Sequence, residues 1–327
     1  MDKNRVMDKN SLEDSYTAAS CDIPWKMLQH PDTRKLWPTH LQLIPTNRCN
    51  GNCNFCSCKA EDRTVELRIT ELKNIVKQFS SMGTKAVTIT GGGEPTMHPN
   101  IKELLTYTAN DQDIDIGLVT NGKMIQADRD LALIIDETTL WLRLSVTEPE
   151  GGYDLDLAAT VISRLPNVDC SFSFTICPNT DLQVAEDICD LAMDSENVTH
   201  VRFVTDIMLA TDPFVQEAFR EVENRLSWCK KAIFQNRNFF TKGSELCWIS
   251  LIKPVLGADG YIYPCCGAQY ATKERGKMPE SMRMCYWSDF EFLIMPFNGV
   301  DCGICYYDNY NYALAKLMQP VEHGNHV

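Results

Sequence analysis

Residues 41–58 read LQLIPTNRCNGNCNFCSC, an apolar run followed by a loop with three cysteines in a C-x3-C-x2-C spacing. The three are Cys49, Cys53 and Cys56. Thiolates packed this densely, with no histidine among them, suit a soft metal centre. On a four-iron cluster, three thiolate ligands leave one iron open to bind another molecule. The loop is therefore predicted to hold an iron-sulfur cluster with one open coordination position.

A zinc site is the alternative for the same loop. Structural zinc takes four ligands in a tetrahedron. The one local candidate for a fourth ligand is Cys58, which follows Cys56 by two residues and is awkwardly placed to close a tetrahedron with the other three. Ligand chemistry therefore favours iron-sulfur over zinc.

A second motif follows the β-branched run at 85–90 and reads GGGEP, from Gly91 to Pro95. Glycines at the end of a strand let the backbone approach a ligand closely. The carboxylate of Glu94 can pair with an ammonium group of a ligand. A glycine-rich turn by itself fits a purely structural role equally well.

Together, the cysteine loop after the first expected strand and the GGGEP turn after the second resemble the radical S-adenosylmethionine enzymes, over roughly residues 38 to 240. The resemblance implies a [4Fe-4S] cluster on the three cysteines, with its fourth iron chelated by the amino and carboxylate groups of S-adenosyl-L-methionine. It places Phe55 beside the adenine. The segment expected to receive the methionyl amino group consists of Gly91, Gly92, Gly93 and Glu94.

The resemblance also implies the chemistry. One electron, from a reducing donor such as flavodoxin or ferredoxin, splits the sulfonium into methionine and a 5′-deoxyadenosyl radical, which removes a hydrogen atom from the substrate. The cofactor supplies this reactivity, while the protein positions the reactants and excludes water.

Composition limits the remaining possibilities. With 327 residues and 44% hydrophobic residues the chain can bury a substantial core, so global disorder is excluded. The formal net charge of -13 repels phosphate backbones and makes extended nucleic-acid binding unlikely. The 15 cysteines do not indicate a secreted disulfide scaffold, because the start of the chain is polar and no membrane span is visible. We therefore expect a cytoplasmic protein whose thiols bind metal.

Strand patterns from residue 140 onward indicate which side chains face the inside of the sheet. In 140–146 the leucines and valine share one face, which leaves Trp141, Arg143 and Ser145 on the other. By analogy with the family, Ser145 is expected to contact the ribose or carboxylate of the cofactor, and Arg143 can bind a carboxylate. The alternative for both is a buried residue satisfied by its neighbours. His200 and Arg202 are candidates for substrate contact.

Ser171, Ser173 and Thr175 form the polar face of the next expected strand. An interior this polar fits a ligand cavity better than a packed core.

Past residue 240 the sequence changes to turns, aromatics and cysteines. A C-x12-G-x4-C arrangement runs from Cys247 to Cys265 and is predicted to form a hairpin with residues 258–260 at its tip. It resembles the auxiliary-cluster (SPASM or Twitch) extensions of radical S-adenosylmethionine dehydrogenases and peptide-modifying enzymes. The four ligands expected for an auxiliary [4Fe-4S] cluster are Cys247, Cys265, Cys302 and Cys305.

Alternatives remain open for this second site. Cys266 or Cys285 can replace one of the four ligands, and the same thiols can bind zinc. The remaining cysteines are expected to be ordinary small apolar side chains. They are Cys21, Cys170, Cys177, Cys189 and Cys229.

Short β-rich runs alternate with amphipathic stretches, a pattern typical of βα units around a parallel sheet. The predicted fold class is α/β, a partial (βα)6 TIM-like barrel with a small C-terminal cysteine-rich auxiliary-cluster domain. Strands are expected near 39–45, 85–90, 113–120, 140–146, 168–176 and 199–205. Helices are expected near 70–79, 99–110, 128–136, 156–165, 181–193 and 213–231, the first with Thr70 as its N-cap.

Three regions are predicted: an N-terminal leader and arm at 1–37, the barrel core at 38–240 and the auxiliary-cluster domain at 241–327. The predicted function is radical oxidation of a small molecule by two electrons, for instance of an alcohol to a ketone. Radical modification of a peptide and a redox-neutral rearrangement or epimerisation are the alternatives among enzymes. A zinc-binding module and an electron carrier are the alternatives without catalysis.

Overall fold

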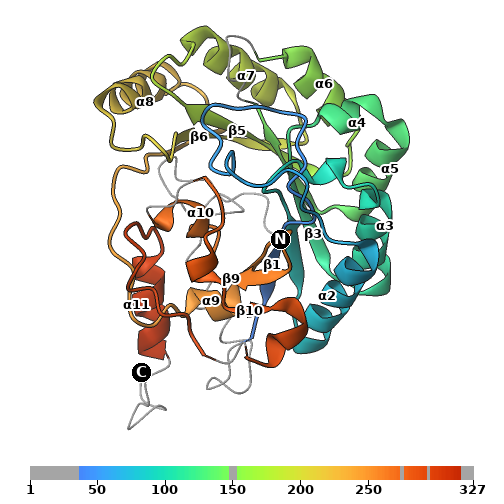
Figure 1. Cartoon of the computed structure of the whole chain (residues 1–327). Helices are drawn as coiled ribbons and strands as arrows, with labels where there is room; N and C mark the ends of the chain where they lie inside the picture. The colour runs from blue at the N-terminus through green and yellow to red at the C-terminus, as the bar shows by residue number, and fades with distance from the viewer. Residues whose placement is uncertain (1–36, 147–152, 273–275, 293–294, 318–327) are drawn as a thin grey trace, which may run out of the picture.

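The computed structural model describes residues 37–146, 153–272, 276–292 and 295–317 (Figure 1). The predicted leader and most of the predicted N-terminal arm lie outside the described residues. No helix in the described part of the chain is long and apolar enough to cross a membrane.

The centre of the molecule is one sheet with the strand order β10-β9-β8-β1-β2-β3-β4-β5-β6-β7. Neighbouring strands from β1 to β7 are parallel. Their bounds are β1 (His40–Leu43), β2 (Ala86–Ile89), β3 (Asp115–Thr120), β4 (Trp141–Ser145), β5 (Asp169–Ile176), β6 (Val198–Thr205) and β7 (Ala232–Gln235). The first six confirm the predicted strands. β7 was not predicted, because its four residues are too short a run to stand out as a strand.

The C-terminal segment extends this sheet on its other side. β8 (Val255–Leu256) pairs parallel to β1, and β9 (Tyr261–Tyr263) and β10 (Cys285–Tyr286) follow in antiparallel order. The predicted hairpin is the β8–β9 pair. Gly260 at its tip has φ +80°, a left-handed conformation that side chains other than glycine rarely adopt. The edge of β1 is therefore covered by residues from the far end of the sequence.

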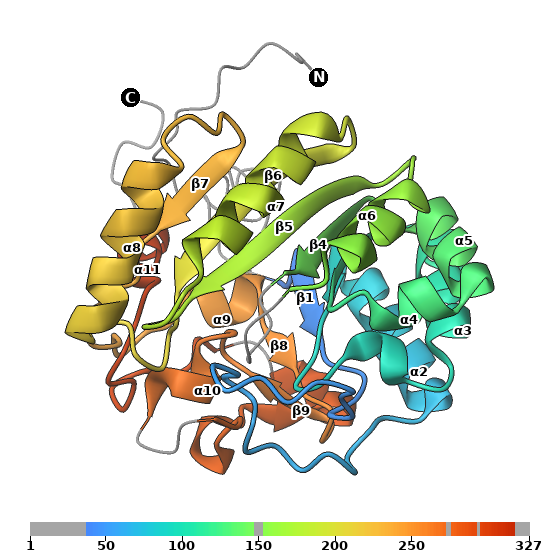
Figure 2. The same cartoon turned by 90° about the horizontal axis from the view of Figure 1, so that it is seen from above.

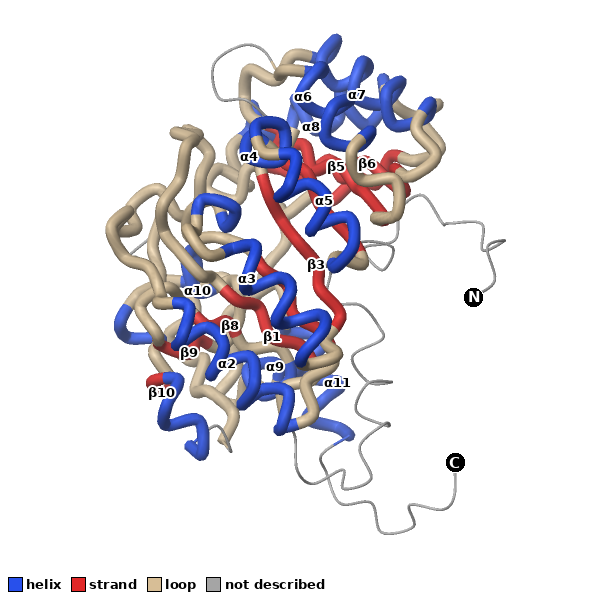
Figure 3. The backbone as a smooth tube through the Cα atoms, turned by 90° about the vertical axis from the view of Figure 1, so that its right-hand side faces the viewer, coloured by secondary structure: helices blue, strands red, loops and turns tan. Residues whose placement is uncertain are grey.

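Helices cover the outer face of the sheet, as Figure 2 shows from above and Figure 3 from the side. These are α2 (Ile69–Met82), α3 (Ile101–Thr106, continued by a π-helical turn Tyr107–Asp111), α4 (Lys123–Ala127), α5 (Arg129–Thr138), α6 (Leu155–Ser163), α7 (Leu182–Asp194) and α8 (Pro213–Arg225). Three short helices belong to the C-terminal segment, α9 (Ile249–Ile252), α10 (Ala268–Ala271) and α11 (Asp308–Leu317). Short 3-10 segments occur at Pro95–Met97, Glu280–Met282 and Trp287–Phe292, the last with a kink at Asp289.

Helix α2 shows how the sequence pattern builds this layer. Leu72, Ile75, Val76 and Phe79 recur at helical spacing and are all buried, as predicted. The prediction that Thr70 is the N-cap is wrong. The helix begins at Ile69, because the carboxylate of Glu71 accepts a hydrogen bond from the backbone N–H of Arg68 at 2.9 Å and satisfies the helix end without a hydroxyl.

The apolar core lies between the sheet and its helices. Leu142 and Leu144 of β4 and Phe172 of β5 are fully buried on this outer face. Alternate residues on the same strands point to the opposite, inner side of the sheet. The predicted division of faces is therefore confirmed for β4 and β5, and the inner side is left for polar side chains.

Candidate active site and auxiliary thiol pocket

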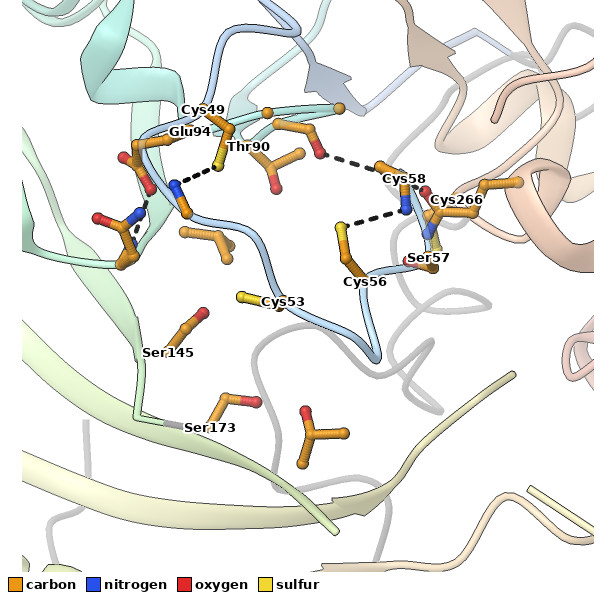
Figure 4. A pocket seen from close by; sticks show the side chains of 18 of the residues that line it. Cys49, Cys53, Cys56, Ser57, Cys58, Thr90, Glu94, Ser145, Ser173 and Cys266 are labelled. Atoms are coloured by element: carbon orange, nitrogen blue, oxygen red, sulfur yellow. Dashed lines mark hydrogen bonds between the residues drawn. The ribbon is translucent and has the colours of Figure 1, made fainter. Parts of the chain in front are cut away.

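A cavity of about 460 Å3 lies at the carboxyl ends of the parallel strands. Its walls come from the cysteine loop, the GGGEP turn, the inner side of β4 to β6 and the C-terminal segment (Figure 4). Ten residues predicted to form the first cluster and cofactor site line it: Cys49, Cys53, Phe55, Cys56, Gly91, Gly92, Gly93, Glu94, Arg143 and Ser145. The fold thus gathers these residues from three separate sequence segments at one place.

The cysteine loop runs from the end of β1 along one wall of the cavity. Figure 4 shows the side chains of Cys49, Cys53 and Cys56 around one part of the cavity. The backbone N–H of Gly51 donates to Sγ of Cys49 at 3.3 Å, and that of Cys58 donates to Sγ of Cys56 at 3.4 Å. Hydrogen bonds to sulfur are one of the means by which proteins tune iron-sulfur clusters. The donor set and its backbone environment therefore fit the predicted cluster.

The geometry gives the zinc alternative less support. Four thiolates about 2.3 Å from one zinc ion must lie within about 4 Å of one another. In the described ranges, no three His, Cys, Asp or Glu side chains converge in a way that could hold a single metal ion. Cys58, the only local candidate for a fourth ligand, is buried, and its Sγ lies 2.7 Å from Oε1 of Gln269.

The GGGEP turn packs directly on the beginning of the cysteine loop. The backbone N–H of Glu94 donates to the carbonyl of Arg48 at 2.7 Å. A β-carbon at Gly93 would collide with the main-chain oxygens of Asn47 and Arg48. Glycine is therefore required at position 93 by the close approach of two backbones, which fixes the turn relative to the cysteines.

The carboxylate of Glu94 is buried and is held by groups of the protein. It accepts hydrogen bonds from the hydroxyl of Thr120 at 2.6 Å, the backbone N–H of Asn121 at 2.8 Å, and both the N–H and the hydroxyl of Thr96. Burial raises the pKa of this carboxyl, and the same hydrogen bonds counteract the rise. Glu94 thus ties the turn after β2 to the turn after β3. Its pairing with the amino group of a ligand stays a prediction.

The inner side of the sheet carries two polar rows. Register pairs Ser145 of β4 with Ser173 of β5, and Ser173 with Arg202 of β6. Ser145, Ser173 and Arg202 all line the cavity, and Figure 4 shows the two serines on neighbouring strands facing it. One step deeper, Arg143 pairs in register with Ser171.

His200 does not reach the cavity wall. It pairs in register with Ser171, is buried, and its Nδ1 lies 2.9 Å from the hydroxyl of Thr199. Burial, followed by the charges of Arg202 and Arg143, lowers the pKa of His200 to about 4. The residue is therefore neutral beneath the cavity, and the geometry does not support its predicted contact with substrate.

A second, smaller pocket lies in the C-terminal segment. Its volume is about 30 Å3, and all four predicted auxiliary ligands line it: Cys247, Cys265, Cys302 and Cys305. The N–H of Gly267 donates to Sγ of Cys265 at 3.3 Å, and Nδ2 of Asn311 donates to Sγ of Cys247 at 3.7 Å. The arrangement repeats the sulfur environment of the cysteine loop and fits a second cluster ligated by four thiolates.

Cys266 and Cys285 lie elsewhere. Cys266 lines the large cavity, and its Sγ lies 3.0 Å from the hydroxyl of Tyr307. Cys285 belongs to β10 and packs against the main hydrophobic core. Neither lines the small pocket, so the alternative ligand sets receive no support from the geometry.

Several residues of the cavity were not predicted from the sequence. They are Arg237, Lys253, Gln269, Tyr270 and Tyr307, all of which follow β7. A polar residue just beyond a short β-rich run was the one available signal, at Arg237. The tyrosines carry no motif. Tyr270 and Tyr307 line both hollows and therefore lie between the large cavity and the four-thiol pocket.

Comparison with known families agrees with this geometry. The family model described as the radical SAM superfamily matches residues 43–151, which include the cysteine loop and the GGGEP turn. Residues 43–151 thus contain a radical SAM domain. Members of this superfamily use a [4Fe-4S] cluster and S-adenosylmethionine, and the cysteine loop and GGGEP turn of this segment both line the large cavity.

Curated relatives match only parts of this chain. GTP 3′,8-cyclase of Actinobacillus pleuropneumoniae serotype 5b is 34% identical over 97 residues, which cover 28% of each chain. 7-Carboxy-7-deazaguanine synthase of Clostridium acetobutylicum is 36% identical over 77 residues, or 23% of this chain and 34% of that one. The matches thus span about a third or less of these relatives.

Solved structures resemble more of the chain. SuiB of Streptococcus suis bound to S-adenosylmethionine has a TM-score of 0.55 and 16% identity over 77% of this chain and 65% of that one. anSMEcpe with bound AdoMet and a peptide has a TM-score of 0.56 and 15% identity over 89% of this chain and 86% of that one. At this identity the likeness shows the fold, a partial barrel of the radical SAM type.

Proposed function

We propose that this radical SAM enzyme oxidises a small molecule by two electrons, with the thiols of the C-terminal segment holding a second [4Fe-4S] cluster. One observation carries the proposal. Four cysteines line a pocket separate from the large cavity, and Tyr270 and Tyr307 line both. A group bound at these thiols is therefore close to whatever occupies the cavity.

Different residues of the cavity have different roles in the proposed reaction. Cys49, Cys53 and Cys56 hold the first cluster, and the backbone of the GGGEP turn lies beside them at a distance fixed by Gly93. Ser145 lies at the carboxyl end of β4, where active sites of α/β barrels gather. When bound, the cluster and S-adenosylmethionine supply the radical that removes a hydrogen atom from the substrate.

The second site favours oxidation because of its ligand count. Four thiolates occupy every iron of a four-iron cluster, so the cluster binds no substrate and serves as an electron acceptor for a substrate radical. Loss of a hydrogen atom and then of one electron and one proton is a net two-electron oxidation.

A redox-neutral reaction is the second candidate, and Cys266 favours it. Its thiol lines the large cavity beside Tyr307. A sulfur–hydrogen bond is weaker than most carbon–hydrogen bonds, so a thiol can return a hydrogen atom to a carbon radical; the thiyl radical that remains would take up one electron, relayed from the reducing donor, and one proton. Epimerisation would follow if the atom returned to the opposite face.

Peptide modification is a third candidate. The similar structures of SuiB and anSMEcpe were both determined with peptides bound, the first with the precursor peptide SuiA. At 15 to 16% identity this likeness supports a related fold. It leaves the substrate of this chain to be tested directly.

The proposal is tested on anaerobically reconstituted protein. Two clusters predict about eight iron and eight sulfide per chain, and about four in a variant with Cys302→Ala. Reduction in the presence of S-adenosylmethionine should yield 5′-deoxyadenosine. With a substrate that turns over, one deoxyadenosine should form per product that has lost two hydrogens. A product that keeps the oxidation state of its substrate contradicts the oxidation and supports the redox-neutral candidate.

A further inference from the structure

A fourth thiol lies in the loop of the three cysteines that are proposed to hold the first cluster. Cys58 follows Cys56 by two residues, and its side chain lines the same large cavity as Cys49, Cys53 and Cys56. The backbone N–H of Cys58 donates to Sγ of Cys56 at 3.4 Å, a contact drawn in Figure 4. A fourth thiolate on the iron that three ligands leave open would close the cluster to other molecules. Cys58 is thus a competitor for that iron within the loop itself.

The side chain of Cys58 is held by the C-terminal segment. Its Sγ lies 2.7 Å from Oε1 of Gln269, a residue of the short helix α10, and 4.0 Å from the carbonyl oxygen of Gly91. Both partners are oxygen acceptors, so the thiol is the donor in either contact. Cys58 is buried, and Gln269 lines the cavity beside it. The shorter contact joins residues that are 211 positions apart in the sequence.

Backbone contacts fix Gln269 relative to the end of the cysteine loop. The carbonyl of Gln269 accepts a hydrogen bond from the N–H of Gly276 at 3.0 Å, and the carbonyl of Gly276 accepts one from the N–H of Ala60 at 2.8 Å. Oε1 of Glu61 accepts a further hydrogen bond from the N–H of Met278 at 2.6 Å. The loop and the C-terminal segment are therefore tied together next to the thiol, and the acceptor oxygen is held in position.

Stability alone explains this pair of residues poorly. A thiol is a weak hydrogen-bond donor. Replacing both partners of a buried hydrogen bond by apolar groups of the same shape is often nearly neutral for the free energy of unfolding. An apolar pair at positions 58 and 269 would therefore pack the two segments equally well, and the hydrogen bond is better explained by the direction that it gives to the sulfur.

We propose that Gln269 is a positioning residue that keeps Cys58 off the first cluster, so that the fourth iron stays open for S-adenosylmethionine. The hydrogen bond directs Sγ of Cys58 toward α10, and this bond has to break before the sulfur can reach the open iron. The C-terminal segment thereby acts on the cysteine loop, in addition to holding thiols of its own. The inference rests on the proposed function, because it concerns the cluster that starts the proposed reaction.

The test is a double-mutant cycle on anaerobically reconstituted protein, with S-adenosylmethionine as the probe. Equilibrium dialysis gives the dissociation constants of wild type, Gln269→Ala, Cys58→Ala and the double variant. In the presence of Cys58, Gln269→Ala should weaken binding about tenfold, as expected if the iron stays open in about one molecule in ten. In the Cys58→Ala background, the same substitution should change the affinity by less than about twofold.

Electron paramagnetic resonance of the reduced protein gives an independent readout. The spectrum of Gln269→Ala without S-adenosylmethionine should differ from that of wild type, and it should change less when the cofactor is added. Both differences should vanish when the double variant is compared with Cys58→Ala. Gln269→Leu keeps the volume of the side chain and replaces Gln269→Ala in the cycle if that variant loses iron. Gln183→Ala removes an exposed glutamine of α7 and is the control, with an expected change in affinity below about twofold.

Unchanged affinity in both Gln269→Ala and Gln269→Leu overturns the inference. Equal weakening with and without Cys58 also overturns it, because the glutamine would then act on the cofactor or on the fold without the thiol. Failure of the proposed function is seen separately, since these measurements contain no substrate. A product that keeps the oxidation state of its substrate contradicts the proposed oxidation and leaves the role of Gln269 standing. A wild-type protein whose spectrum does not respond to S-adenosylmethionine contradicts both.

Discussion

Cys265 and Cys266 are adjacent in the chain, yet they line different hollows. Cys265 lines the pocket with three other cysteines, whereas Cys266 lines the large cavity, with its Sγ 3.0 Å from the hydroxyl of Tyr307. The two cysteines lie after β9 at the start of a turn, in which the backbone N–H of Ala268 donates to the carbonyl of Cys265 at 3.2 Å. The two thiols therefore have separate roles, and their variants should behave differently.

Cys266→Ser tests the reaction type. The substitution should leave the iron content at about eight per chain, because the thiol is outside the four-cysteine pocket. If the enzyme oxidises its substrate by two electrons, the variant should still form product, at a rate within about threefold of wild type. If the variant makes deoxyadenosine but no product, and wild-type product takes up one solvent deuterium, Cys266 is the hydrogen donor and the reaction is redox-neutral.

Cys49→Ala should abolish deoxyadenosine formation, because two thiolates cannot retain the open-site cluster. Iron should fall by about four per chain, and circular dichroism should remain that of the folded protein, because the loop lies outside the apolar core. A variant that still cleaves S-adenosylmethionine at the wild-type rate would refute the assignment of this loop.

Cys302→Ala should lower the melting temperature as well as the iron content. Metal binding at four thiols contributes folding free energy to the C-terminal segment. Loss of one ligand should therefore lower the free energy of unfolding by roughly several kcal/mol. Cys285→Ala is the matched control, because that cysteine packs in the core without lining the pocket, and only about 1 kcal/mol should be lost. Equal iron loss in both variants would place Cys285 among the ligands.

Gly93→Ala should separate the GGGEP turn from the cysteine loop. The added methyl group meets main-chain oxygens, which cannot move aside as a flexible side chain would. We expect a loss of about 1–3 kcal/mol in the free energy of unfolding and weaker binding of S-adenosylmethionine in equilibrium dialysis. Gly303→Ala is the control, because its β-carbon would lie 3.4 Å from the carbonyl of Ala271, an ordinary contact. Unchanged affinity in Gly93→Ala would show that the turn does not set the binding site.

His200→Gln should flatten the dependence of stability on pH. The folded pKa of about 4 lies below the unfolded value of about 6.5, so the unfolded chain binds a proton first as the pH falls. This contribution is absent above pH 6.5 and lowers the free energy of unfolding by about 2 kcal/mol at pH 5. Urea unfolding at pH 7 and pH 5 measures it. A variant with the same difference between the two pH values as wild type would show that His200 is not the responsible group.

The sequence predicted the elements that repeat and missed those that depend on distant partners. Six strands were placed because each apolar run alternates with an amphipathic helix, and α2 showed its buried face in Leu72, Ile75 and Phe79. The start of α2 was misplaced, because Thr70 resembles a cap while Glu71 does the capping. β7 is four residues long and is a strand because β6 lies beside it.

The parts of the site whose chemistry requires a fixed spacing of residues could be predicted from the sequence. The parts that are assembled from distant segments could not. The cysteine loop and the GGGEP turn each consist of residues that are close together in the sequence, so each can be recognised as a motif. Arg237 enters the cavity only because β7 extends the sheet, and Tyr307 enters because the C-terminal segment folds back over it. Arg237 has only the weak signal of a polar residue just beyond a short β-rich run, and Tyr307 has none, since no rule of spacing links positions that only tertiary structure brings together.

The pairing of β1 with β8 joins residues that lie more than 200 positions apart in the sequence. At about 5–20 residues per second of synthesis, β1 waits about 10–40 s on the ribosome before its edge is covered. During that interval the nascent chain offers three reduced thiols beside an open strand edge. Iron delivery in the cell therefore has a window before the C-terminal residues close over the loop, and oxygen has the same window.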